Sequence, residues 1–341
     1  MSVVLSGSPA LAPLLARGAL LSPFKRPRPD AGFPRDRLVL PGLRIDLARL
    51  AAYERVCGFA TGDDALPLTY PHVLGFPLAM RLMSGRGFPL PLLGLVHTSV
   101  EITRRRALAA TGEYELAVHV GGLAPHRRGT EASVITEVRT GGEVVWESRS
   151  AYLARHRTAR TAEPPGTDRR GTDLRGSDPR ETEPRGTDSR GTDPHGTDPH
   201  GTDLRGTDPR ETDPPGTEPR ETEPPVAVPG PLPAVAEWHL GGDVGRRYGA
   251  ASGDRNPIHL YPLTARLFGF PRAVAHGMWT AARCLAAHGA PERVRVRAEF
   301  RAPVLLPGTV TYAADGGRFE LRGGERVHVS GVVEDLGPGG R

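Results

Sequence analysis

The sequence predicts an α+β protein whose two halves share one layout. Each half contains an apolar stretch of helical length, followed by segments in which apolar and polar residues alternate with the period of a strand. A long polar repeat separates the two halves and differs from both in composition. We therefore expect each half to fold as an antiparallel sheet wrapped around one buried helix.

The chain of 341 residues divides into five consecutive segments. We expect a flexible lead at residues 1–35, a first folded half at 36–157, a disordered linker at 158–232, a second folded half at 233–335 and a short tail at 336–341. The apolar stretch at 10–21 follows no cationic region and is interrupted by Pro13, so it predicts neither a signal peptide nor a membrane span. We expect a cytoplasmic protein without membrane contact. Cys57 and Cys284 are typical of buried thiols in a reducing compartment.

In the first half, residues 47–56 are amphipathic, and residues 76–83 predict a short apolar helix. The pair Gly141-Gly142 is a hairpin signal between the last two strands of this half. The predicted strands are 96–104, 113–121, 131–139 and 143–153.

The second half repeats this plan. An amphipathic stretch at 244–252 comes first, then a loop rich in polar groups, and then an apolar run at 273–287 that predicts a buried helix. The clearest strand is 293–301, because its apolar residues fall on one face and its arginines and glutamate on the other. The remaining predicted strands are 309–314, 319–322 and 327–334.

The linker consists of twelve copies of a five-residue repeat at 166–225: Gly or Glu, Thr or Ser, Asp or Glu, any residue, then Arg, His or Pro. Almost no apolar side chain is present to offset the entropy of ordering, and the frequent Pro and Gly break helices and strands. The repeat therefore predicts a disordered polyampholyte, with an interaction tether as the alternative. His195 and His200 are explained by copying of the repeat, although metal binding stays open.

Charge is unevenly distributed. The formal net charge is +5, whereas residues 158–225 hold 10 Arg and 16 acidic residues, so the rest of the chain carries +11. A basic folded portion suits an anionic ligand such as a phosphate-bearing cofactor. Solvated arginines are an equal alternative. Nucleic acid is disfavoured, because the aromatic residues do not interleave with a basic stripe.

The most informative motif is Asp254-Arg-Asn256-Pro-Ile-His259, followed eighteen residues later by Gly277. A carboxylate and an imidazole can shuttle protons, and a helix that starts at Gly277 can hold negative charge developing on an oxygen. Such a set predicts addition or removal of water. The alternative is a structural Asx-turn. A calcium-binding loop is excluded because Ile258 occupies a ligand position. A serine hydrolase is excluded because Ser252 lies in no nucleophile elbow.

These residues resemble a known family. The stretch from Tyr248 to His259, with Leu267-Phe-Gly-Phe-Pro271 and Ala275-His-Gly-Met-Trp279, is similar to the hydratase motif of the MaoC-like dehydratases, also called (R)-specific enoyl-CoA hydratases or hydratase 2. Residues 66–77 and 88–97 resemble the degenerate first repeat of two-repeat members. The resemblance implies a double hot-dog fold. It also implies one active site, because Asp63-Asp64 in the first half lacks the Asn-Pro-x-His that follows in the second.

By this resemblance, Asp254 and His259 share the proton transfers, Asn256 orients the water or the histidine, and the Gly277 N–H binds the thioester oxygen. Further candidates for substrate binding are Ser252, His276, Met278 and Arg301. For Met278 the alternative is core packing. Arg301 and the run Arg104-Arg105-Arg106 could bind the phosphates of CoA. The alternative for these arginines is that they form a solvated face. His72, His97 and His126 could line a groove or serve only structure.

The implied enzyme is a hydro-lyase that interconverts trans-2-enoyl and (R)-3-hydroxyacyl thioesters. CoA or a carrier-protein phosphopantetheine is then part of the substrate, and no metal or redox cofactor is implied. One alternative is a hot-dog acyl-CoA thioesterase, and another is a non-catalytic acyl-thioester-binding or scaffold subunit that acts through the repeat. Chain length, direction of the reaction and a homodimer stay open.

Overall fold

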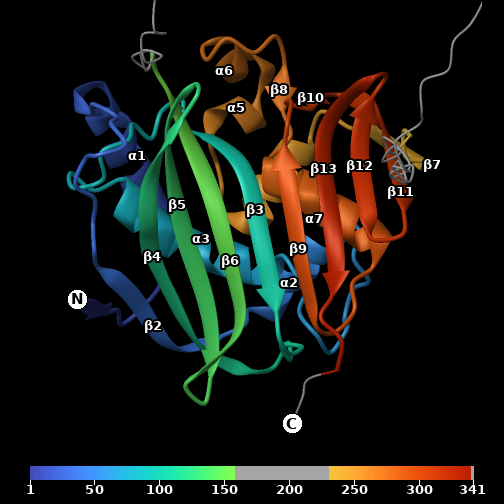
Figure 1. The fold of residues 1–341 in the computed structure, drawn as a ribbon, viewed down its shortest axis with the longest axis horizontal. Coiled ribbons are helices and arrows are strands. Elements are labelled where there is room, and N and C mark those ends of the chain that lie inside the picture. The colour runs from blue at the N-terminus through green and yellow to red at the C-terminus, as the bar shows by residue number, and fades with distance from the viewer. Residues whose placement is uncertain (158–229, 339–341) are drawn as a thin grey trace, which may run out of the picture. The chain divides into compact units, whose positions relative to one another are not determined.

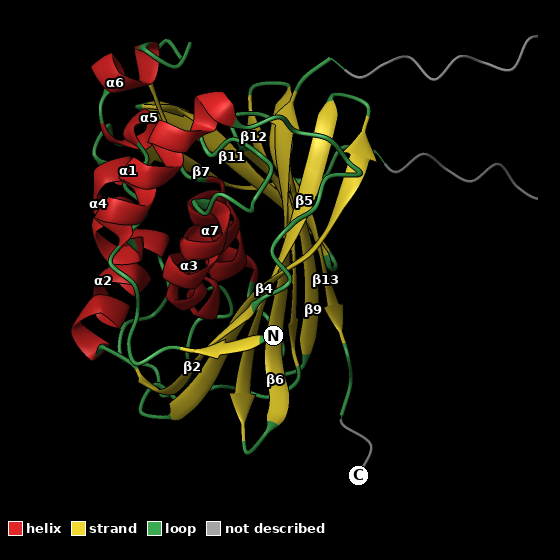
Figure 2. Cartoon of the chain, turned by 90° about the vertical axis from the view of Figure 1, so that its left-hand side faces the viewer, coloured by secondary structure: helices red, strands yellow, loops and turns green. Residues whose placement is uncertain are grey.

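The computed structural model describes residues 1–157 and 230–338, which form one compact unit. The predicted linker falls almost wholly outside the described residues. An eleven-stranded sheet has the order β1-β2-β4-β5-β6-β3-β9-β13-β12-β11-β7 and is antiparallel except where β1 meets β2. The helices gather on one face of this sheet (Figure 1 and Figure 2). The predicted α+β class and hot-dog fold are confirmed.

The first half wraps its sheet around α3 (Tyr70–Met83). Gly75 allows α3 to approach the sheet closely, because a Cβ there would lie 2.5 Å from the Thr136 side chain. A second helix, α2 (Leu47–Cys57), starts where the Asp46 carboxylate accepts hydrogen bonds from two backbone N–H groups, and it ends at Gly58 with φ of 80°. The strands are β2 (Arg37–Arg44), β3 (Val96–Arg104), β4 (Glu113–His126), β5 (Gly129–Thr140) and β6 (Glu143–Arg155).

The second half places α7 (Gly277–His288) in the corresponding position, after α4 (Val244–Ser252) and the short helices α5 (Pro257–Leu260) and α6 (Pro262–Arg266). A two-stranded sheet joins β8 (Ala273–Val274) to β10 (Leu305–Leu306), so the predicted helix at 273–287 starts only at Gly277. The other strands are β7 (Ala234–Leu240), β9 (Val294–Phe300), β11 (Gly308–Asp315), β12 (Arg318–Gly323) and β13 (Arg326–Asp335).

The two halves share one core. Strands β3 and β9 pair from Ser99↔Glu299 to Arg104↔Val294, so the two sheets are continuous. The Trp279 indole N–H of α7 donates to the Val56 carbonyl of α2 at 2.8 Å. Arg49 of α2 donates to the carbonyls of Ala251 and Ser252, each at 2.8 Å. The first half therefore fixes the end of α4, directly before Asp254.

The first 35 residues are folded, and the prediction of a flexible lead is wrong. Strand β1 (Ser2–Val4) pairs with β2, and α1 (Leu11–Leu21) packs against α3. The Lys25 ammonium group donates to the Gly85 and Phe88 carbonyls. In the apolar stretch at 10–21, Leu11, Leu14 and Leu15 pack against the core of the first half, whereas Leu20 is 74% exposed.

Cys57 and Cys284 are both buried and unpaired, as expected. Burial raises the pKa of each thiol far above its ordinary value. Among the helices that the structure describes, none is long and apolar enough to cross a membrane.

Candidate active site

Asp254 lies in a tight turn directly after α4. The helix ends at Gly253, whose φ of 85° suits glycine. The Asp254 N–H donates to Ser252 Oγ, and Asp254 Oδ1 accepts the Asn256 N–H, both at 3.1 Å. Asn256 in turn caps α5 by accepting the Ile258 N–H. The Asx-turn alternative is therefore locally correct, and the turn leaves Asp254 Oδ2 facing His276 Nε2 at 3.9 Å.

His259 is fixed by a main-chain carbonyl. Its Nδ1 lies 2.6 Å from the oxygen of Val274 in β8. Because a carbonyl can only accept, Nδ1 carries the hydrogen, and Nε2 of the neutral ring is the basic nitrogen. Burial lowers the pKa of His259, and the nearby Asp254 carboxylate partly offsets this effect. The ring is thus oriented as a neutral base beside a carboxylate.

His276 holds the Asp254 turn against the start of α7. Its Nε2 donates to the Asp254 carbonyl at 2.9 Å, and its ring stacks on His259 with centroids 3.7 Å apart. Burial lowers the pKa of His276 well below its ordinary value, so the ring is neutral. Its Nδ1 is buried without a hydrogen-bond partner. The geometry gives His276 a positioning role beside its predicted place in the substrate site.

Gly277 is the first residue of α7, and its position depends on Phe300. A Cβ at Gly277 would lie 3.2 Å from the Phe300 ring, tighter than ordinary contact. The first N–H groups of a helix have no intrahelical acceptor, so this end of α7 can donate to an oxygen in the cavity. Packing against Phe300 therefore favours glycine at this position.

All eight predicted site residues line one cavity of about 500 Å³. Ser252 and Met278 are buried in its wall, while Arg301 is exposed, pairing with Glu299 at 2.9 Å and with Ser330 at 2.8 Å. Arg104 is different. It donates to the carbonyls of Pro291 and Glu292, each at 2.8 Å, so it ties the two halves together and is not part of the cavity wall.

The first half supplies a large part of this cavity, which the motif alone did not reveal. His72 and His97 line it, whereas His126 lies elsewhere and accepts the Arg128 N–H. The His97 ring stacks on Tyr152 with centroids 4.5 Å apart. Burial lowers the pKa of His72 to about 4 and that of His97 to about 3, so both rings are neutral. Tyr152 had no sequence signal, because it reaches the site through strand pairing.

The cavity wall contains both apolar and basic side chains. The apolar ones from residues 1–157 are Leu15, Val73, Phe76, Met80, Met83, Leu92, Leu95 and Val96. Four exposed arginines also line it, two from each half: Arg128, Arg155, Arg301 and Arg326. The catalytic motif is part of the same wall. An amphipathic ligand with an apolar tail and an anionic head fits this arrangement.

Asp254, His259 and His276 also form a candidate metal site. One ligand atom each from Asp254, His259 and His276 lies within 4.8 Å of the others, a spacing that a metal ion could bridge. Two of the four ring nitrogens donate to carbonyl oxygens, and the imidazoles stack face to face. These contacts leave His259 Nε2 and His276 Nδ1 as the ring nitrogens with a free lone pair, which can accept a proton or bind a metal ion.

Comparison with known proteins identifies the family of this chain. Residues 215–332 match the profile of the MaoC like domain. Over 293 residues the chain is 34% identical to 3-hydroxyacyl-thioester dehydratase X of Mycobacterium tuberculosis, covering 85% of this chain and 84% of that protein. The chain belongs to the MaoC-like dehydratase family. The predicted family and the predicted enzyme class, a hydro-lyase, are thereby confirmed.

Solved MaoC-like structures show the same fold. The crystal structure of HtdX from Mycobacterium tuberculosis has a TM-score of 0.63 and 28% identity, covering 88% of this chain and 100% of that one. A MaoC-like dehydratase from Phytophthora capsici has a TM-score of 0.57 at 15% identity, covering 89% of this chain and 96% of that one. The second likeness supports the fold alone.

Proposed function

We propose that this MaoC-like protein reversibly hydrates trans-2-enoyl thioesters to (R)-3-hydroxyacyl thioesters. The observation that carries the proposal is the His259–Val274 hydrogen bond, which leaves a basic Nε2 in the same cavity as the Asp254 carboxylate. Membership of the dehydratase family supports this reaction class. The name of the Mycobacterium tuberculosis relative, a 3-hydroxyacyl-thioester dehydratase, supports the substrate class.

In the hydration direction, the Asp254–His259 pair accepts a proton from one water molecule. The water oxygen forms a bond to C3, and the electron pair of the C2=C3 bond moves toward the thioester oxygen. C2 then takes a proton from the pair, which returns to its starting state. Dehydration is the reverse sequence, in which the 3-hydroxyl group leaves as water. Such general acid–base steps contribute about 10²–10⁴ in rate each.

The helix start at Gly277 stabilises the intermediate. Negative charge develops on the thioester oxygen when water adds to C3, and the Gly277 N–H at the first position of α7 donates to that oxygen. Phe300 packs against Gly277 and keeps this end of the helix in place. Because the donor is a backbone N–H group, a substitution of Gly277 can move this donor but does not remove it.

The first half binds the acyl chain. His72, Phe76, Met80 and Met83 line the cavity at intervals of about one helical turn along α3. The eleven residue-to-residue steps from His72 to Met83 rise by about 16 Å, enough for a chain much longer than crotonyl. The exposed arginines of the cavity wall receive the phosphate of CoA or phosphopantetheine. On this proposal, the degenerate half has exchanged catalysis for chain binding.

The experiment is a hydration assay that follows loss of conjugated-enoyl absorbance with crotonyl-CoA and a longer enoyl-CoA. We expect rapid loss in the wild type, an (R)-alcohol product, and at least a hundredfold lower rate for Asp254→Asn and for His259→Ala. His126→Ala is the matched control, because this histidine lies outside the cavity. Activity that persists in both site variants would contradict the assignment of Asp254 and His259. Release of free CoA would indicate a thioesterase instead.

A further inference from the structure

An exposed apolar patch lies beside the active site. It consists of Tyr261, Leu263, Leu267 and Phe268, on α6 and the turns at its two ends. Leu263 is 71% exposed and Leu267 is 80% exposed, unusual values for leucines so close together. Figure 1 shows α5 and α6 at the upper edge of the molecule, next to β8.

The patch is continuous with the catalytic cavity. Ile258 and His259 precede it in the chain, Phe270 follows it, and all three line the cavity. Thr264 Oγ1 donates to the Pro257 and Tyr261 carbonyls at 2.6 and 2.9 Å, which ties α6 to α5. A partner seated on this patch therefore lies next in the chain to residues that line the cavity.

The surroundings of the patch are basic. Residues 255–291 contain no acidic side chain. Arg255, Arg266 and Arg272 are exposed within that stretch, and the four exposed arginines of the cavity wall add to the same sign of charge. An apolar patch with positively charged surroundings is complementary to the surface of a small, acidic protein.

We propose that the patch is the docking surface for an acidic carrier-protein domain, which delivers the acyl group on a phosphopantetheine arm. This inference rests on the proposed function and names the carrier of its substrate. CoA would use the cavity and its arginines, since its phosphates need charge. Only a macromolecule has the area to cover leucines outside the cavity.

The test compares one acyl group on two carriers. The enoyl group trans-2-decenoyl is loaded on CoA and on a purified acidic acyl carrier protein, and kcat/KM is measured for wild type, Leu267→Glu and Arg266→Glu. For both variants, we expect kcat/KM to fall at least tenfold with the carrier-protein thioester and to keep the wild-type value with the CoA thioester. Activity on the CoA thioester also shows that each variant is folded.

Val332→Glu is the matched control, because Val332 is 40% exposed on β13 and lies outside the patch. It introduces the same charge and should leave both substrates unaffected. Raised ionic strength should weaken turnover of the carrier thioester more than that of the CoA thioester.

Three outcomes separate the inference from the function beneath it. An equal decrease in kcat/KM for both thioesters, or no decrease for either, would contradict the proposed docking surface and leave the hydratase proposal intact. A change from dimer to monomer in Leu267→Glu, measured by sedimentation, would assign the patch to a second copy of the chain. Failure of the wild type on both thioesters would overturn the proposed function itself.

Discussion

The Nδ1 atom of His259 lies 2.6 Å from the carbonyl oxygen of Val274. Val274 pairs with Leu305 in the two-stranded sheet formed by β8 and β10, so a main-chain ladder holds the acceptor in place. The acceptor fixes which ring nitrogen carries the hydrogen. The basic nitrogen of the site is therefore selected by backbone structure and not by a further side chain.

This relationship predicts the pH profile. Burial lowers the pKa of His259 from its ordinary 6.5, so the neutral ring persists to lower pH than a free histidine would allow. We expect the acidic limb of kcat/KM to lie at lower pH than the titration of a free histidine, whose pKa is 6.5. In Asp254→Asn the offsetting carboxylate is lost, so the acidic limb of the residual activity should move to lower pH. A limb that moves to higher pH would contradict this arrangement.

The Gly277–Phe300 contact predicts a stability defect with a specific rescue. The Cβ of Gly277→Ala would lie 3.2 Å from the Phe300 ring, and such overpacking typically costs about 1–3 kcal/mol. We expect a lower free energy of unfolding and a lower hydration rate, because the first turn of α7 must shift. Phe300→Leu in the same chain should restore much of the stability. Equal unfolding free energies for Gly277→Ala and wild type would rule out the packing role.

Much of the fold followed from the sequence. Strand β3 and helix α4 occur at their predicted bounds, because their apolar residues follow one clear period. Strand β2 was missed, since Pro41-Gly42 interrupts its alternation and shifts its register against β4. The order at residues 1–35 was missed because it depends on α3, which lies far away in the chain.

The candidate site, like the fold, was predicted from the sequence only in part. The residues of the Asp254–His259 motif and Gly277 were named from local spacing, and the structure brings them to one cavity. Tyr152 and Met80 were not named, because pairing of β3 with β9 brings their half against the second. Local patterns identified the candidate proton-transfer groups, whereas tertiary contacts supply much of the cavity wall.

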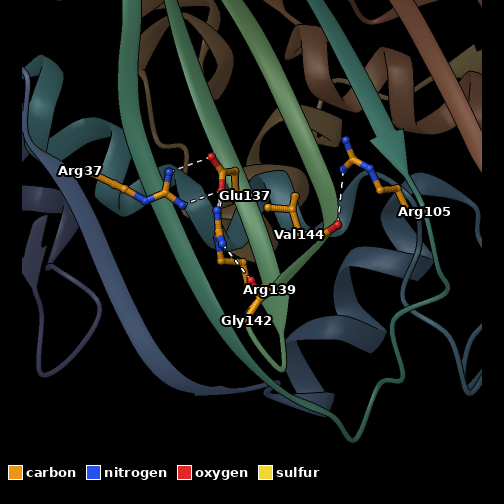
Figure 3. Close-up of polar contacts among 6 residues, drawn as sticks. All are labelled: Arg37, Arg105, Glu137, Arg139, Gly142 and Val144. Carbon is orange, nitrogen blue, oxygen red and sulfur yellow. Dashed lines mark hydrogen bonds and ion pairs between the residues drawn. The ribbon is translucent and has the colours of Figure 1, made fainter.

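On the first half, Glu137 is paired with two arginines. Arg37 and Arg139 both donate to its carboxylate, at 2.5 to 2.9 Å for the closest pairs (Figure 3). These contacts, led by the hydrogen bond from Arg37, lower the pKa of Glu137 to about 2. The pairing stabilises the protein fully above the ordinary pKa of 4.5, and the contribution is lost as pH falls from there toward 2.

We therefore expect Glu137→Gln to lower the free energy of unfolding at neutral pH by about 1–3 kcal/mol, the range of charged hydrogen bonds with allowance for the partly exposed arginines. The difference from wild type should shrink below pH 4.5, as urea unfolding at several pH values would show. Glu113→Gln is the control, because its pair with Arg44 is exposed and should change stability by less than about 1 kcal/mol. A constant difference at all pH values would exclude the charge as its source.

The apolar wall of the first half predicts control of acyl chain length. Removing that half altogether would unpair β9 from β3 and expose the shared core, so a single substitution is the cleaner test. Met80 lines the cavity and is buried, and Met80→Trp adds volume where the acyl tail would extend. We expect kcat/KM to fall at least tenfold for a decenoyl thioester and to stay near the wild-type value for crotonyl-CoA. Met80→Leu conserves volume and should leave both unchanged. If Met80→Trp reduced both substrates equally, the chain would bind elsewhere, and the first half would serve structure alone.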